Sequence, residues 1–99
     1  MNDSEFITLA NKKLDQIEEM IESQYEECDV SRMGNVLQII MESGQEIVLN
    51  LQTPLHELWM ASRLGGRHYQ WNVRRQAWVN TKNQKTLDES FAFTLKRLL

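Results

Sequence analysis

The sequence predicts an α+β fold, a two-layer sandwich in which two helices pack on one face of a largely antiparallel sheet of five to six strands. Three observations support this. Apolar residues near the start recur with helical spacing, the middle of the chain breaks into short β-rich segments, and a helix-starting motif follows them. A chain of 99 residues can bury one hydrophobic core, so a single domain is expected over residues 1–99.

The first helix is predicted over about residues 3–25. Asn2 and Glu5 have the spacing of a capping pair at its start. At about 100° per residue, the apolar side chains fall on one side of the helix and most of its acids on the other. The apolar side comprises Phe6, Leu9, Ala10, Leu14, Ile17, Met20 and Ile21.

Five segments rich in β-branched and aromatic residues predict the strands, and turn residues such as Gly34-Asn35 and Gly65-Gly66 separate them. A further edge strand is expected near residues 29–33. The spacing leaves no room for crossover helices, so an antiparallel meander is predicted. The five segments are residues 36–42, 46–52, 58–62, 67–73 and 77–80.

A second helix is predicted to begin at Thr86, where Glu89 completes a capping box. Its buried stripe would contain Leu87, Phe91, Leu98 and either Thr94 or Leu95. Neither helix can bury its apolar side alone, so both are expected on the same face of the sheet.

The composition and the distribution of charge limit the classes of protein to which this chain can belong. Residues 1–30 contain nine acids and two lysines, whereas residues 31–99 contain five acids and nine bases. No apolar run approaches the ~20 residues of a membrane span, so no membrane partner is expected. The sequence shows no secretory or organelle-targeting pattern, and the lone Cys28 fits a reducing compartment. A cytoplasmic protein is therefore expected.

Seven carboxylates crowd into residues 15–29 with no basic residue among them. Acids near a helix C-terminus oppose the helix dipole, and like charges four residues apart repel each other. A feature that works against stability without local compensation indicates a function, although a solvated helix face is the structural alternative. The seven, called the acidic ridge below, are Asp15, Glu18, Glu19, Glu22, Glu26, Glu27 and Asp29.

Carboxylate oxygens at this density would attract a multivalent cation or a basic protein surface. Hard cations such as Fe³⁺ and Ca²⁺, and by extension lanthanides, prefer oxygen ligands. Because solvent-exposed ligands without a paired histidine form no closed cage, weak and unselective binding at several sites is expected. A dense anionic surface would also steer a basic partner and make association sensitive to salt.

The segment from Asn50 to Gly66 carries a motif, Asn-x-Gln-x-Pro-x-x-x-x-Trp, followed by Gly-Gly and an aromatic strand. With this motif the chain resembles the frataxin family, and within it the bacterial, CyaY-like branch, over essentially its whole length. The resemblance implies the sandwich fold, weak binding of Fe²⁺ and Fe³⁺ on the ridge, and a regulatory or adaptor role in iron–sulfur cluster assembly. The implied partners are the cysteine desulfurase and the scaffold protein, and the protein would donate or sense iron.

The resemblance also assigns surfaces. The desulfurase would dock on Glu18, Glu19 and Glu22, with iron modulating that contact. Strand alternation sets Asn50 and Gln52 opposite to Ile47, Leu49 and Leu51, and the resemblance places them with Trp59 on the exposed face of the sheet. We call Asn50, Gln52 and Trp59 the sheet patch. Other divalent or lanthanide ions would substitute for iron. A monomer is expected without iron, and iron-driven oligomers remain open.

The sequence departs from the family pattern at two places, and each departure predicts a difference in iron binding or stability. The first strand usually adds acids to the ridge, but here it reads Ser31-Arg32-Met33, which predicts a lower iron capacity and more weight on the helix carboxylates. The sequence also stops at Leu99, where many relatives continue into a tail that packs between the helices. Marginal stability is therefore expected.

Two other functions compete with this interpretation. No nucleophile–base pair is apparent and no catalytic residue is proposed, so an enzyme is not expected, although a slow ferroxidase or iron-storage activity stays open. A small nucleic-acid-binding domain is the other alternative, because aromatic and basic residues alternate late in the chain. The isoelectric point of about 5.3 opposes it. Its candidate residues are Arg63, Arg67, Tyr69, Trp71, Arg74, Arg75 and Trp78.

Overall fold

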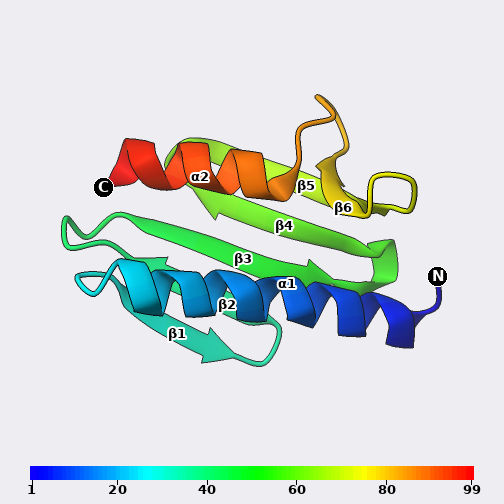
Figure 1. Ribbon diagram of the computed structural model, residues 1–99, viewed down its shortest axis with the longest axis horizontal. Coiled ribbons are helices and arrows are strands. Elements are labelled where there is room, and N and C mark those ends of the chain that lie inside the picture. The colour runs from blue at the N-terminus through cyan, green and yellow to red at the C-terminus, as the bar shows by residue number, and fades with distance from the viewer.

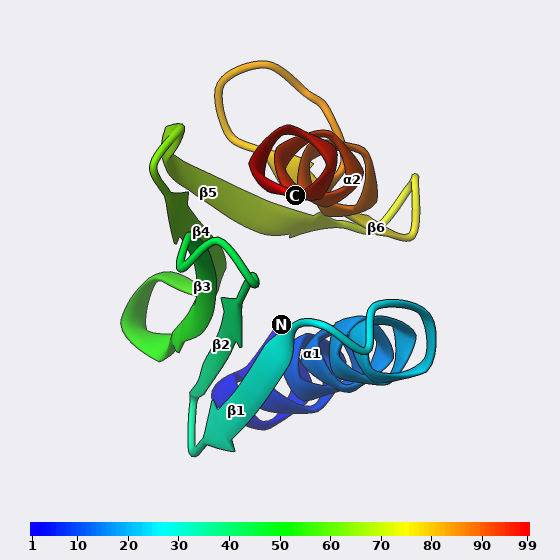
Figure 2. The ribbon, with the colours of Figure 1, turned by 90° about the vertical axis from the view of Figure 1, so that its left-hand side faces the viewer.

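The computed structural model describes residues 1–99 and contains two helices and one six-stranded sheet (Figure 1). Both helices cover the same face of the sheet, as the end-on view in Figure 2 shows. The predicted two-layer α+β sandwich is confirmed. In chain order the elements are α1 (Asp3–Gln24), β1 (Asp29–Met33), β2 (Val36–Ile40), β3 (Glu46–Gln52), a 3₁₀ turn η1 (Thr53–Leu55), β4 (Glu57–Ser62), β5 (Gly65–Asn72), β6 (Ala77–Asn80) and α2 (Leu87–Leu98).

All strands are antiparallel and stand in the order β1-β2-β3-β4-β5-β6, so each pairs with its neighbour in sequence. The predicted meander and its edge strand are both present. The strand β2 ends at Ile40, earlier than predicted, because the Met41 N–H donates to the Gln45 carbonyl at 2.8 Å and closes the turn. Gly34, with φ of 56°, supplies the left-handed backbone in the β1–β2 turn.

The helix α1 begins where the sequence predicts. The Asn2 side chain accepts from the Glu5 N–H at 2.8 Å, and the Glu5 carboxylate accepts from the Asn2 N–H at 3.1 Å. These bonds satisfy two backbone donors that the first turn of a helix leaves free. The apolar side of α1 is buried at Phe6, Ala10, Leu14, Ile17 and Ile21. Its last turn contains no basic residue.

The second helix, α2, has the same kind of start. Glu89 and Thr86 form a capping box, and the buried stripe contains both Thr94 and Leu95. The Lys13 ammonium reaches across from α1 to the Asp88 carboxylate at 2.9 Å and joins the two helices near the start of α2.

The core lies between the helices and the inner face of the sheet, and it forms one cluster of 20 buried residues. Along β3, Ile47, Leu49 and Leu51 point into this core, as the alternation predicts. Neither α1 nor α2 covers the opposite, outer face of the sheet (Figure 2). It carries Val48, Asn50 and Gln52, all half-buried.

The aromatic platform considered for nucleic acids is largely buried. Tyr69 is 0% exposed and Trp78 2%, and Trp71 packs against the core from the inner face. The Trp71 and Trp78 rings meet edge to face, with centroids 5.6 Å apart. These rings are therefore engaged in packing the sandwich rather than free to stack on bases.

Candidate functional site

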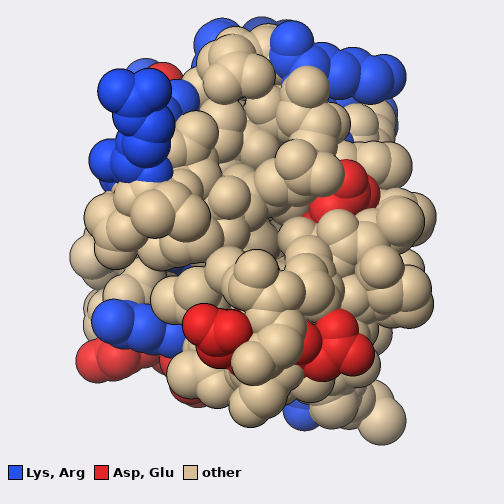
Figure 3. Space-filling view, turned by 90° about the vertical axis from the view of Figure 1, so that its right-hand side faces the viewer, with Lys and Arg blue, Asp and Glu red and all other residues tan.

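The acidic ridge runs along the solvent side of α1, through the α1–β1 turn and onto the start of β1. Six of its carboxylates belong to exposed residues, and Glu18 is half-buried. On the face drawn in Figure 3, most basic side chains gather along the upper edge and most acidic ones lie lower. On this end of the molecule, where α1 begins, acidic and basic side chains are thus largely separated.

The expectation that the ridge lacks a compensating cation is wrong at one end. Arg32 on β1 donates to Asp15 at 2.9 Å and to Glu18 at 3.2 Å, and its other terminal nitrogen donates to the Asn11 side chain at 2.8 Å. The strand β1 lies beside α1, so a basic residue distant in sequence reaches the helix carboxylates. The remaining five ridge carboxylates form no ion pair.

No group of three or more His, Cys, Asp or Glu side chains converges on a point where a metal ion would be held. The ridge is therefore a row of separate ligands. Such a row can attract a hydrated cation or share it between neighbours, but it does not enclose the ion.

Cys28 lies at the end of the ridge and is only 9% exposed. Burial raises the pKa of its thiol, and the negative charges of Glu27 and Asp29 raise that pKa further. The thiolate is the form that binds metals and reacts as a nucleophile, so Cys28 is held in its less reactive form.

The sheet patch lies on the outer face, in the direction that strand alternation predicts. Asn50 stands opposite Trp59 in the β3–β4 register. The Gln52 amide donates to the Asn50 side-chain oxygen at 2.7 Å, so the two amides present one fixed polar edge. All three patch residues are half-buried, with the Trp59 ring among polar side chains.

The sequence interpretation missed three residues that hold Trp59 in place. The Trp59 indole N–H donates to Glu57 Oε1 at 2.8 Å, and Gln70 Nε2 donates to Glu57 Oε2 at 3.1 Å. The His68 ring stacks on Trp59 with centroids 4.2 Å apart and an interplanar angle of 5°. We call Glu57, Trp59, His68 and Gln70 the Glu57 cluster. The sequence could indicate only the face on which each of these side chains lies. The β4–β5 register, which the sequence does not give, brings the four together.

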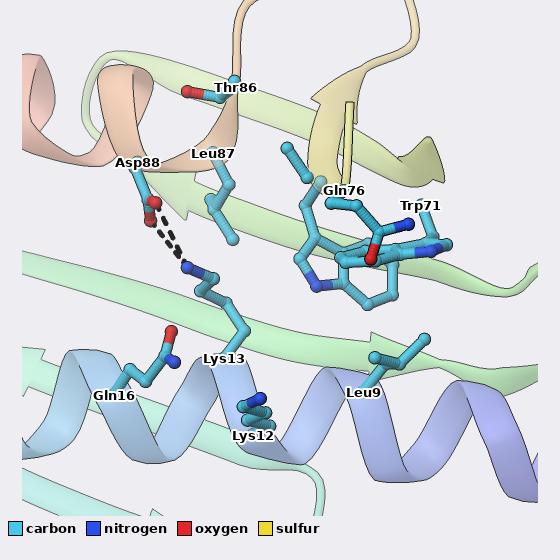
Figure 4. A pocket seen from close by; sticks show the side chains of 11 residues that line it. Leu9, Lys12, Lys13, Gln16, Trp71, Gln76, Thr86, Leu87 and Asp88 are labelled. Atoms are coloured by element: carbon cyan, nitrogen blue, oxygen red, sulfur yellow. Dashed lines mark hydrogen bonds and ion pairs between the residues drawn. The ribbon is translucent and has the colours of Figure 1, made fainter. Parts of the chain in front are cut away.

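A groove of about 290 Å³ separates the two helices. Leu9, Trp71, Trp78 and Leu87 supply its apolar walls, and the Lys13–Asp88 pair crosses it (Figure 4). No residue of the chain fills this space, so part of the apolar surface between the helices remains open to solvent.

Comparison with known proteins agrees with the fold and the motif. The sequence profile described as the frataxin-like domain matches residues 1–99. The iron–sulfur cluster assembly protein CyaY of Cupriavidus taiwanensis is 39% identical over 87 residues, which cover 84% of this chain and 77% of that protein. The protein of the same name from Actinobacillus succinogenes is 41% identical over 88 residues, covering 89% of this chain and 84% of the relative.

The solved structure of frataxin from Psychromonas ingrahamii superimposes with a TM-score of 0.86 at 34% identity, over 98% of this chain and 91% of that one. The fold defines the class of the protein: it is an open α+β sandwich in which two helices cover one face of a sheet. The chain belongs to the frataxin-like family. None of its helices is long and apolar enough to cross a membrane.

Proposed function

We propose that this protein acts in iron–sulfur cluster assembly as a non-enzymatic, iron-binding regulator or adaptor. Relatives about 40% identical to it carry the name of iron–sulfur cluster assembly proteins. The ridge would attract Fe²⁺ or Fe³⁺ weakly and dock on a basic surface of the cysteine desulfurase. The sheet patch would contact a partner protein, either the desulfurase or the scaffold protein.

The observation that carries this proposal is the open part of the ridge. Glu19, Glu22, Glu26, Glu27 and Asp29 are exposed and unpaired, and they lie on the last part of α1 and just beyond its C-terminus, where negative charge is least favourable. Such an arrangement costs stability, and binding a cation or a basic surface would relieve it. Unpaired charges also speed the encounter with an oppositely charged partner.

The sheet patch supports a second contact. A tryptophan ring amid fixed polar side chains is the kind of anchor that protein interfaces use. Because Glu57 takes up the indole N–H, the Trp59 ring is held in one orientation before any partner arrives. A preorganised anchor loses less conformational entropy on binding.

The test is desulfurase-coupled cluster assembly on a scaffold protein, with and without this protein, across a range of iron concentrations. The ridge variant Glu19→Gln/Glu22→Gln should lose its effect on the assembly rate and bind the desulfurase more weakly. The control Glu42→Gln/Glu46→Gln removes the same charge from exposed residues outside the ridge and should behave like the wild type. Equal effects of the two double variants would refute a specific role for the ridge.

A further inference from the structure

Arg32 divides the ridge into two halves. Its side chain is 19% exposed, and its two terminal nitrogens bind Asp15, Glu18 and Asn11 at 2.8–3.2 Å. Its Nε is buried without a hydrogen-bond partner, so one donor of the guanidinium is unused. Every polar contact of the side chain is made with α1, and two of the three acceptors are carboxylates.

Arg32 is a permanent cation, because the guanidinium of arginine stays charged in proteins. Any metal ion approaching Asp15 or Glu18 would meet both the occupied oxygens and the repulsion of the guanidinium. The pair is partly buried on the Arg32 side, so salt screens this repulsion less than it would between two exposed charges. The other five carboxylates carry no such competitor.

We infer that Arg32 is a resident counter-cation that closes the Asp15–Glu18 half of the ridge and confines cations and basic partner surfaces to the open half. The open half consists of Glu19, Glu22, Glu26, Glu27 and Asp29. This inference rests on the proposed function of the ridge and refines it. Arg32 thus withdraws two helix carboxylates, Asp15 and Glu18, from the ridge.

The test uses the diamagnetic ion La³⁺ as the probe and the side-chain carboxyl ¹³C signals of the labelled protein as the readout. In the wild type, the Glu22 and Glu26 signals should move as La³⁺ is added, while Asp15 and Glu18 stay in place. Arg32→Met keeps the apolar stem and removes the charge. In this variant Asp15 and Glu18 should move as well, and La³⁺ affinity there should rise on the order of tenfold, the effect of removing one like charge.

Two further variants separate the effect of Arg32 from general causes. Arg63→Met removes the same charge from an exposed residue in the β4–β5 turn and should reproduce the wild-type pattern. Arg32→Lys keeps the charge but loses the planar fork, so its response should lie between those of the wild type and Arg32→Met. The amide spectrum of each variant reports whether the fold is retained.

Movement of Asp15 and Glu18 together with Glu22 in the wild type would overturn the inference, and so would an unchanged pattern in Arg32→Met. If no ridge signal moves in the wild type, metal binding in the proposed function fails instead. In that case, movement of Asp15 and Glu18 confined to Arg32→Met would still support closure by the arginine, and no movement would refute it.

Discussion

Glu57 is the residue on which the outer surface of the sheet depends most. It is 9% exposed, and its two oxygens accept from Trp59 and Gln70 while His68 Nδ1 lies 3.6 Å from Oε1. A carboxylate this far removed from water is retained only when its oxygens are bonded. Glu57 therefore helps to fix the orientation of the Trp59 ring.

Replacing Glu57 with alanine should lower the free energy of unfolding by about 1–3 kcal/mol, because the indole and amide donors lose a charged acceptor. Urea unfolding would measure this. Glu46 also accepts a hydrogen bond on the outer face, from Gln38 at 3.1 Å, but it is exposed. Glu46→Ala should change stability by less than about 0.5 kcal/mol. Equal losses at the two positions would contradict the role of Glu57.

Tyr69 gives the protein a dependence on alkaline pH. Its hydroxyl is buried without a hydrogen-bond partner. Burial raises the pKa of the phenol above its ordinary value of 10.0, and nearby Ser90, Asn80 and Arg67 offset part of that rise. Between the two pKa values the unfolded chain holds fewer protons than the folded one, so stability falls as pH rises.

Wild-type stability should therefore fall more steeply above pH 10 than that of Tyr69→Phe, which cannot ionise. Below pH 10 the difference between the two proteins should not change with pH. Denaturant unfolding at several pH values would show this, and parallel curves across the alkaline range would exclude Tyr69 as the source.

At the scale of elements, the charged residues of α1 favour the helix dipole at the start of the helix and oppose it at the end. Asp3 and Glu5 in the first turn favour the helix dipole, but the last turn contains Glu22 and no basic residue. Glu22 also has Glu18 one helical turn before it, which adds repulsion. The cost is tolerated at the end of the helix where the open half of the ridge lies.

Glu22→Lys should therefore raise the free energy of unfolding by roughly 0.5–1 kcal/mol at low salt while weakening metal binding. Glu5→Lys, the same substitution in the first turn, should lower stability, because it removes a capping carboxylate and opposes the dipole. Thermal unfolding of both variants tests the pair. A loss of stability in Glu22→Lys would mean that the ridge is not strained.

The elements could be predicted from the sequence largely because their signals are local. Each helix start is marked by a motif only four residues long, Asn2 with Glu5 and Thr86 with Glu89, and both capping boxes are present. The pairs that depend on register or packing could not be predicted. Arg32 and Asp15 are 17 residues apart and meet only because β1 lies beside α1. The Glu57 cluster likewise depends on the β4–β5 register.

For the whole molecule, the groove between the helices sets a limit on stability. Its walls include Leu9 and Trp71, which are only partly buried, so the sandwich gains less from apolar burial than a closed one would. We expect a melting temperature within or below the ordinary range of ~45–65 °C for mesophilic domains. Circular dichroism would measure it, and a transition well above that range would contradict this expectation.

The consecutive strand order has a consequence for synthesis on the ribosome. Each strand pairs with the strand that precedes it in the sequence. The hairpins can therefore form one after another as the chain is synthesised. Only α2, the last element, must arrive before the inner surface of β5 and β6 is covered. A nascent chain stalled before residue 87 would lack Ser90 of α2 beside Tyr69, so this apolar surface would be exposed to solvent and prone to aggregation.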